Sequence, residues 1–305
     1  DSTNVSSASI VPVPDGLPDI GALNLLSRIC RQTSYSHLSH QKHTSRDVDK
    51  SDEIDGDQKV IPAATPSALP GGNLTGDALH CAIEELLRAN NFQDMISDSR
   101  QTRQMVYNYL KRNGIISLVM KTSGKSERAV NNAVDAALNC VTGALTTSIT
   151  LPGTGQTISI ASLAQTDRIP EMEFMLQADI HWVHGFMDVV FRIPNPDEPV
   201  HPWRYFVLDW KSDTLPAYNQ DTIKQCIHSR HYYLQSRLYS HALDRYLHGV
   251  LGNSYRPQQH LGGAVYLFLR EQESGPRDAA TTWSYSAQPE EDRSFVLTAI
   301  RESYE

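Results

Sequence analysis

The chain has 305 residues, of which 40% are hydrophobic and 20% charged, and its net charge is −8. This balance excludes a chain that is disordered throughout and predicts a soluble globular protein with a hydrophobic core. The longest apolar runs are too short to cross a bilayer, so we expect no membrane partner and a cytoplasmic location. An acidic chain does not hold nucleic acid by bulk electrostatics alone, although a metal-dependent nuclease needs carboxylates of its own.

The first part of the chain shows little regular patterning. Residues 1–40 include a short apolar stretch, and we expect them to form an N-terminal segment that packs on the main domain. Residues 41–70 combine many charges with several prolines and glycines, which predicts an acidic, Pro-rich linker or mobile loop. Regular patterns then return, and residues 71–305 are predicted to form the main domain.

A helical region of three or four helices is predicted over about residues 75–145. Apolar residues recur at helical spacing from Thr75 onward, with Glu84 and Glu85 on the opposite side. The helical pattern is interrupted near Gly114 and again near Gly124, so we expect separate helices there.

An α/β core is predicted over about residues 147–270. Several short β-like runs indicate strands of one sheet, and residues 222–247, which contain no Pro or Gly, indicate one long helix before a buried strand. This succession predicts a mixed central sheet with helices packed on it. In the tail, residues 271–286 are predicted as a surface turn region and residues 293–304 as a final helix. The predicted strands are Thr157–Ile160, Glu173–Gln177, Val183–Phe191 and Tyr205–Asp209.

Two predicted strands bring charged side chains together. Residues two apart in a strand point to the same face, so Asp209 and Lys211 project together. If the strand that carries Asp188 pairs with them as a hairpin, a second carboxylate reaches the same place. Two carboxylates suit Mg²⁺ or Mn²⁺, the metal lowers the pKa of its bound water, and a lysine stabilises charge on phosphorus. The pattern predicts phosphodiester hydrolysis, and its alternative is a surface ion pair at a strand end.

These motifs resemble the nuclease domain of the RecB family, a branch of the PD-(D/E)XK phosphodiesterases. The resemblance is loose over residues 93–150, over Pro194–Pro202 and after Arg270. It implies a PD-(D/E)XK nuclease core, with a mixed central sheet flanked by helices and an additional helical region. The segments that carry it are Thr33–Ser36, Leu69–Gly72, Gly76–His80, Glu173–Phe174, Gly185–Asp188, Leu208–Ser212, Tyr232–Tyr239, Ala242–Leu247 and Gly262–Arg270.

The resemblance also implies roles for single residues. Catalysis would depend on Asp188, Asp209 and Lys211, the last as the catalytic lysine. The implied cofactor is Mg²⁺, for which Mn²⁺ or Ca²⁺ could substitute in binding. Without the resemblance, His80 could instead be satisfied by Glu84, one turn along the same helix. The implied metal ligands are His80, Asp188, Asp209, the main-chain carbonyl of Trp210, and Glu173 directly or through water.

The predicted long helix supplies further site residues. Tyr232, Gln235 and Tyr239 lie on one stripe of it, and the last two match the Q-x-x-x-Y pattern of the family. The resemblance implies that these residues position Lys211 and the DNA backbone, although Tyr232 could instead be an ordinary packing residue. Basic side chains on the same helix predict a track for DNA phosphates, formed by Lys224, Arg230, Arg237 and Arg245.

The function predicted from these features is that of a Mg²⁺-dependent DNA nuclease in DNA-end processing and recombinational repair. The implied partners are DNA, with single strands favoured, a helicase region of the same longer chain, and RecC-like and RecD-like subunits. The alternative is a catalytically inactive nuclease-fold module that binds DNA or holds subunits together. A related nuclease with an iron–sulfur cluster is not expected, because it would require a cysteine set that this chain lacks.

Overall fold

The computed structural model describes residues 31–34, 67–178, 181–275, 277 and 279–302. The predicted N-terminal segment, residues 1–40, is therefore described only at 31–34, and the predicted linker, 41–70, only at 67–70. Everything else predicted for these two segments, including the second half of the Thr33–Ser36 motif, lies outside the described residues.

Five helices form the described helical region, where three or four were predicted. The side chain of Asp98 starts one of them by accepting hydrogen bonds from the main-chain N–H groups of Arg100 and Gln101. Gly114 separates two others because it adopts the left-handed conformation, with φ of 75°. The helices are α3 (Asn73–Arg88), α4 (Phe92–Ser97), α5 (Ser99–Arg112), α6 (Ile115–Thr122) and α7 (Glu127–Thr146).

The central sheet is mixed and has six described strands, in the order β1-β5-β6-β7-β8 with β4 also paired to β5. Strands β5 and β6 are antiparallel, which confirms the predicted hairpin. Strands β6 and β7 are parallel and β7 is buried along its whole length. The strands are β1 (Arg31–Ser34), β4 (Arg168–Ala178), β5 (His181–Pro194), β6 (Trp203–Lys211), β7 (Leu261–Phe268) and β8 (Thr282–Ser286).

Two predicted strand assignments are wrong. The segment Thr157–Ile160 does not join the central sheet, because its first two residues form β3 (Thr157–Ile158), which pairs with β2 (Ile149–Thr150) in a separate two-stranded sheet. The segment predicted as a surface turn region contains an edge strand of the central sheet, β8, because its residues pair with the buried strand β7.

The predicted long helix is two helices, α8 (Gln220–Ser229) and α9 (Tyr232–Leu251). The break comes at His231, which adopts a left-handed conformation with φ of 56° and so cannot continue the right-handed helix. The predicted final helix is confirmed as α11 (Pro289–Glu302), and a short helix, α10 (Pro257–His260), leads into β7.

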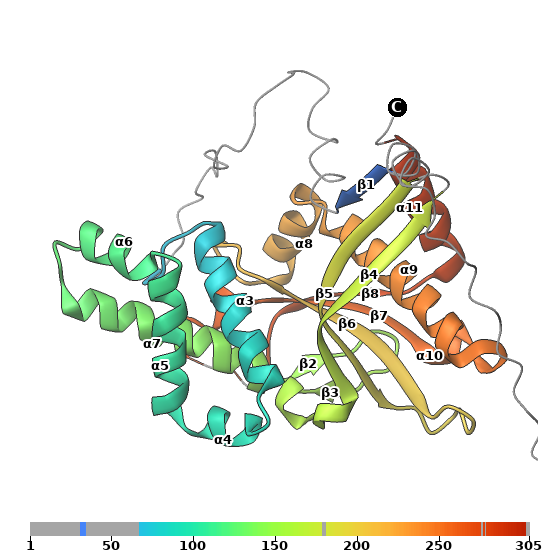
Figure 1. Cartoon of the computed structure of the whole chain (residues 1–305), viewed down its shortest axis with the longest axis horizontal. Coiled ribbons are helices and arrows are strands. Elements are labelled where there is room, and N and C mark those ends of the chain that lie inside the picture. The colour runs from blue at the N-terminus through green and yellow to red at the C-terminus, as the bar shows by residue number, and fades with distance from the viewer. Residues whose placement is uncertain (1–30, 35–66, 179–180, 276, 278, 303–305) are drawn as a thin grey trace, which may run out of the picture.

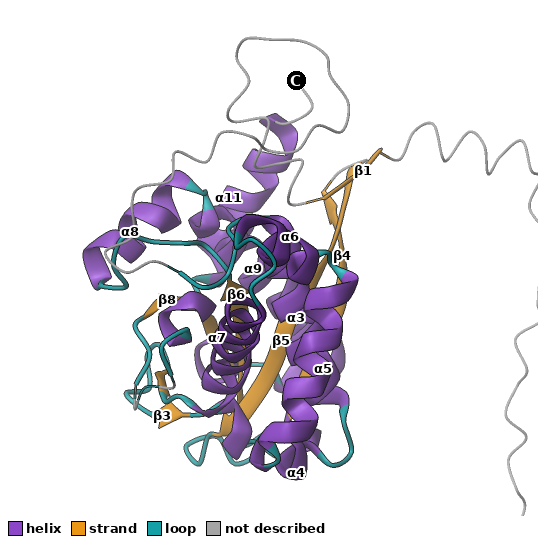
Figure 2. Ribbon diagram, turned by 90° about the vertical axis from the view of Figure 1, so that its left-hand side faces the viewer, coloured by secondary structure: helices purple, strands orange, loops and turns teal. Residues whose placement is uncertain are grey.

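Helices cover both faces of the central sheet (Figures 1 and 2). The helical region packs on one face, where its core includes Val189 of β5 and Leu208 of β6. Helices α8, α9 and α11 pack on the other face, where the core includes Met187 of β5 and Val207 of β6. No helix in the described part of the chain is both long and apolar enough to span a bilayer.

Candidate active site

The candidate active site lies where β5 and β6 separate. The last residues that pair across the two strands are Val189 and Leu208. The next residues along the same register are Asp188 and Asp209, so the two carboxylates face each other at the mouth of the strand pair. Strand β6 continues to pair with β7 as far as Lys211, which keeps the end of β6 in place.

The regular alternation of side chains along β5 is broken at Asp188. Met187 and Val189 are two residues apart and both are fully buried, but they belong to the cores on opposite faces of the sheet. Glu171, which continues the β4–β5 register opposite Asp188, has an unusual φ of 50°. The Asp188 carboxylate accepts a hydrogen bond of 2.7 Å from the main-chain N–H of Trp210, which ties it to β6.

Helix α3 brings His80 to these carboxylates. His80 Nδ1 lies 3.5 Å from Asp188 Oδ2. The helix can approach closely because Gly76 has no side chain: a Cβ atom there would lie 2.5 Å from Ser212 Oγ. Glu84, the alternative partner of His80, instead forms an ion pair of 2.9 Å with Arg88.

Lys211 is held on several sides. Its Nζ lies 2.5 Å from Asp209 Oδ2 and donates a hydrogen bond of 2.7 Å to Gln235 Oε1. The same Nζ lies 4.0 Å from the centre of the Tyr232 ring, a cation–π contact. Gln235 in turn donates a hydrogen bond of 2.9 Å to the hydroxyl of Tyr239. The structure therefore gathers the three predicted residues of α9 around the predicted catalytic lysine.

Burial and mutual charge shift the ionisation of this group. Asp209 is only 2% exposed, which rules out an ordinary surface ion pair with Lys211. Burial raises the pKa of Asp209 to about 6 and Asp188 adds to the increase, against the opposing charge of Lys211. Burial also disfavours the charged form of Asp188, but His80 and Lys211 outweigh it and hold the pKa of Asp188 below its ordinary value. The pKa of His80 is raised because Asp188 outweighs burial.

Two predicted site residues do not join this group. Glu173 is on the same strand as Glu171, but its side chain is 64% exposed and lies 2.7 Å from His184 Nε2. Arg237 packs over the ring of Phe295 on α11 and lies 3.9 Å from Asp292. Glu173 was assigned from its position in a motif and Arg237 from the basic side chains of its helix, and neither pattern fixes where a side chain points.

The acidic neighbour of Asp188 is Glu171, which the sequence reasoning missed. Burial, with Asp188 and Glu84 nearby, raises the pKa of Glu171 to about 7. Its proximity to the site depends on the positive φ at this position. A positive φ at a residue other than Gly, Asn or Asp leaves no clear sequence signal.

The donor set has the chemistry of a site for a hard divalent cation. As they stand, no three His, Cys, Asp or Glu side chains in the described residues form a complete metal-binding group. Asp209 Oδ2, however, is buried and makes no hydrogen bond, although it lies against Lys211. Two buried carboxylates share the single positive charge of Lys211, and a divalent cation would offset the remaining negative charge. The carboxylate oxygens of Asp188 and Asp209, with His80 beside them, therefore have the chemistry of a site for Mg²⁺ or Mn²⁺.

A small cavity opens beside Lys211. Its volume is about 220 Å³, and His80, Asp213, Arg230 and Tyr232 are among the residues that line it. Of the group described above, His80, Lys211 and Tyr232 line this cavity, so we name it the Lys211 cavity.

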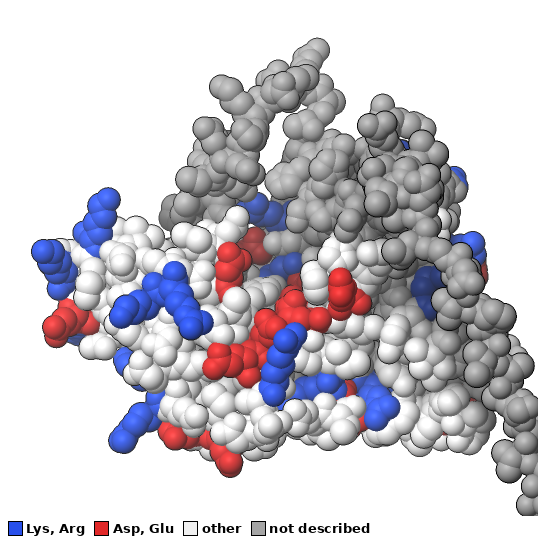
Figure 3. Space-filling view, in the orientation of Figure 1, with Lys and Arg blue, Asp and Glu red and all other residues white. Residues whose placement is uncertain are grey.

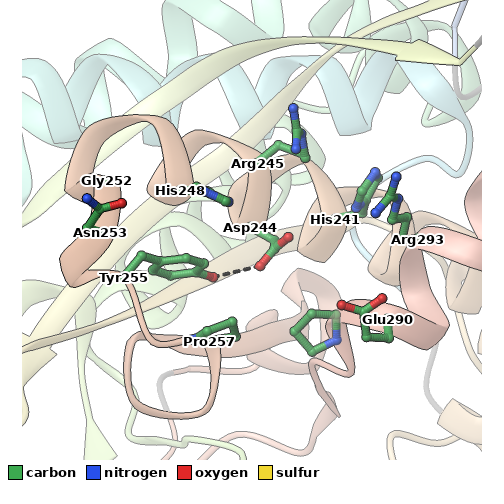
Figure 4. Close-up of a pocket in the computed structure, with 11 residues that line it drawn as sticks. His241, Asp244, Arg245, His248, Gly252, Asn253, Tyr255, Pro257, Glu290 and Arg293 are labelled. Carbon is green, nitrogen blue, oxygen red and sulfur yellow. Dashed lines mark hydrogen bonds between the residues drawn. The ribbon is translucent and has the colours of Figure 1, made fainter.

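A second cavity lies further along α9 (Figure 4). Its volume is about 390 Å³, and Asp244, on its wall, accepts a hydrogen bond of 2.7 Å from the Tyr255 hydroxyl. Two carboxylates and two guanidinium groups line it, so their formal charges cancel. Arg245, from the predicted phosphate track, lines this cavity, but the predicted metal ligands and the predicted catalytic lysine do not. His80, Lys211 and Tyr232 line the Lys211 cavity, where we place the candidate active site.

The chain is similar to proteins described as RecBCD enzyme subunit RecB. It is 38% identical to that of Escherichia coli (strain K12) over 105 residues, which cover 33% of this chain and 8% of the relative. It is 31% identical to that of Haemophilus influenzae over 152 residues, which cover 39% of this chain and 12% of the relative. It is 26% identical to that of Buchnera aphidicola subsp. Baizongia pistaciae over 261 residues, which cover 81% of this chain and 20% of the relative. No family model matches the chain.

These matches confirm the resemblance to the RecB family that the motifs indicated, and the chain is a relative of RecB. The chain spans 20% or less of the length of these three relatives. The relationship therefore concerns one part of RecB.

Proposed function

We propose that this relative of RecB is a Mg²⁺-dependent deoxyribonuclease of the exodeoxyribonuclease V type. The observation that carries the proposal is the meeting of His80, Asp188, Asp209 and Lys211 at the point where β5 and β6 separate. Three metal-ligating side chains beside a lysine are the groups that metal-assisted phosphodiester hydrolysis requires.

In this proposal each group has one task. His80, Asp188 and Asp209 would hold Mg²⁺, which supplies an activated water when bound. Lys211, whose ammonium is fixed by Gln235 and by the Tyr232 ring, stabilises the negative charge that develops on the phosphate during cleavage. Because its position is fixed before the reaction, little reorganisation is needed in the transition state.

The competing proposal is an inactive nuclease fold that binds DNA or holds subunits together. Such a module has no need of two buried carboxylates beside a lysine, because burying charged groups costs free energy even when they are paired. The presence of this costly arrangement favours an active enzyme.

The proposed setting is DNA-end processing and recombinational repair. The relatives are named as subunits of a RecBCD enzyme, and by analogy we propose that a helicase region of a longer chain and RecC-like and RecD-like subunits deliver DNA to this domain. The acidic chain by itself offers little attraction for a polyanion. We therefore expect the isolated chain to bind DNA weakly and to favour single strands.

The direct test is cleavage of linear single-stranded and double-stranded DNA by the purified chain, with Mg²⁺ or with EDTA. We expect cleavage only with the metal, and loss of cleavage in Asp188→Asn and Asp209→Asn variants that remain folded. Cleavage that survives in EDTA or in both variants would contradict the proposed mechanism. DNA binding without any cleavage would favour the inactive module.

A further inference from the structure

The Lys211 cavity is lined by a second cation, Arg230. His80, Lys211, Asp213 and Tyr232 are among the other residues that line it. Asp and Glu side chains gather in a band across the middle of the face seen in Figure 3. A cation at the cavity therefore has a large local effect on a polyanionic substrate.

The main chain of Arg230 is fixed at the joint between α8 and α9. Arg230 is the residue that caps α8, and its N–H donates a hydrogen bond of 2.9 Å to the carbonyl of Cys226. His231, which follows, has the left-handed conformation that ends one helix and starts the next. The break in the predicted long helix thus directs Arg230 to the cavity, while Arg237 on α9 packs against α11.

Asp213 connects Arg230 to the catalytic lysine. Its Oδ1 lies 3.4 Å from Arg230 Nε, and its Oδ2 accepts a hydrogen bond of 2.9 Å from the hydroxyl of Tyr232. The ring of the same tyrosine covers Lys211 Nζ. One carboxylate therefore orients both cations of the cavity, Arg230 by direct pairing and Lys211 through Tyr232.

We propose that Arg230, oriented by Asp213, binds a phosphate group of the DNA strand next to the phosphate that is cleaved. The contact with Asp213 involves Nε, and the Arg230 side chain remains 40% exposed at the cavity. A guanidinium presents several donors in one plane and can bind phosphate oxygens while it keeps a carboxylate partner. Arg230 is a substrate-binding residue in this proposal. The proposal rests on the proposed nuclease function, because only a nuclease has a cleaved phosphate next to the one that Arg230 binds.

A matched pair of arginines allows a specific test. Arg103 also contacts an aspartate through Nε, at 2.9 Å from Asp135, and its side chain is 37% exposed, close to the 40% of Arg230. Arg103 is in the helical region and does not line the Lys211 cavity. The variant Arg103→Ala therefore controls for the loss of a partly exposed ion pair outside the Lys211 cavity.

The experiment measures binding of a fluorescent single-stranded oligonucleotide by the wild type, Arg230→Ala, Arg230→Lys and Arg103→Ala over a range of salt, with Ca²⁺ in place of Mg²⁺. For Arg230→Ala we expect about tenfold weaker binding at low salt, and a slope of log affinity against log salt that is smaller by about 0.7 to 1. Arg230→Lys should keep the slope and recover part of the affinity, and Arg103→Ala should match the wild type.

An unchanged salt slope in a folded Arg230→Ala variant would overturn the proposal, because a purely structural arginine does not release counterions from DNA. Failure of the wild type to bind the oligonucleotide would overturn it as well. If the wild type binds but does not cleave DNA with Mg²⁺, the nuclease proposal fails, while the salt slope still decides whether Arg230 contacts phosphate.

Discussion

Arg270 Nε donates a hydrogen bond of 2.8 Å to the main-chain carbonyl of Ser212, the residue that follows Lys211. The same guanidinium, in a side chain that is almost fully buried, donates hydrogen bonds to the carbonyls of Leu69 and Pro70, just before α3. Arg270 therefore ties the end of β6, which carries Asp209 and Lys211, to the start of the helix that carries His80.

We predict that Arg270→Lys weakens both the fold and metal binding. A lysine cannot bond the same set of carbonyls, and each carbonyl left unsatisfied costs about 1–3 kcal/mol. We expect the free energy of unfolding to fall by about 2–4 kcal/mol. Mn²⁺ affinity, measured by calorimetry below the unfolding temperature, should fall by about tenfold, because small displacements of ligands reduce binding. The control is Arg277→Lys, because the Arg277 side chain is largely exposed and its ion pair with Glu271 is long, at 3.7 Å. Destabilisation with wild-type Mn²⁺ affinity would show that Arg270 has no part in aligning the ligands.

Lys211 should affect cleavage and leave binding of the metal largely intact. Replacing it with Ala removes the charge that stabilises the transition state, so we expect cleavage to fall on the order of a hundredfold or more. The measurements are the single-turnover cleavage rate with Mg²⁺ and, separately, Mn²⁺ affinity and thermal unfolding. A folded Lys211→Ala variant that cleaves at the wild-type rate would remove the lysine from the mechanism.

Two replacements separate the two contacts of Tyr232. Tyr232→Phe keeps the ring over Lys211 but loses the hydrogen bond to Asp213, so we expect cleavage to fall by less than about threefold. Tyr232→Leu removes the ring, and with it a cation–π contact whose loss predicts a fall of about tenfold. The cleavage rate is the readout and thermal unfolding is the control. Equal rates in the two folded variants would show that the ring does not position the lysine.

The pairing of Asp209 with Lys211 could be predicted because it depends on local rules. The two-residue period of a strand places them on one face, and hydrophobic neighbours bury the aspartate. The hairpin that brings Asp188 follows from the same period and from the short connection between the strands. The helical region was predictable in kind because its apolar residues follow helical spacing, although its division into five helices was not.

The parts that could not be predicted depend on backbone conformation and on distant packing. The positive φ of Glu171 has no sequence signal, and that of His231 has only the weak preference of histidine for this conformation. The first accompanies the approach of Glu171 to Asp188, and the second ends the α8 segment that brings Arg230 to the cavity. Strand β8 was missed because its partner β7 supplies most of its order. The packing of Arg237 against α11 could not be predicted, because a helical stripe does not reveal which neighbour covers it.

The two glutamates of β4 should differ in their effect on metal binding. Glu171 lies near Asp188 and His80, so removing its charge in Glu171→Gln should lower Mn²⁺ affinity on the order of tenfold. Glu173 is largely exposed and pairs with His184, so Glu173→Gln should change the affinity by less than about twofold. Because the pKa of Glu171 is raised to about 7, the two are compared by titration calorimetry at a fixed pH of about 8 and fixed salt, where Glu171 carries its charge. If Glu173→Gln instead lowered Mn²⁺ affinity more than Glu171→Gln, Glu173 would be the acidic residue that helps to bind the metal.

The last prediction concerns His260, which is fully buried before β7. Its Nδ1 accepts a hydrogen bond of 2.9 Å from the main-chain N–H of Arg256, so the folded protein requires the neutral ring. Burial lowers the pKa of His260 below its ordinary value of 6.5, and the pKa of His241 is lowered for the same main reason.

Below about pH 6.5 these histidines therefore bind protons in the unfolded chain but stay neutral in the folded chain. Their contribution to stability is complete above about pH 6.5 and decreases as the pH falls below that value. Each histidine contributes at most about 1.4 kcal/mol per pH unit. We expect His260→Asn, which can keep the hydrogen bond from Arg256, to show a shallower loss of unfolding free energy than the wild type in urea titrations from pH 7 to pH 5. His248→Asn is the control because His248 is exposed and should leave the slope unchanged. An equal slope in His260→Asn and the wild type would mean that His260 takes up its proton in the folded state as readily as in the unfolded chain.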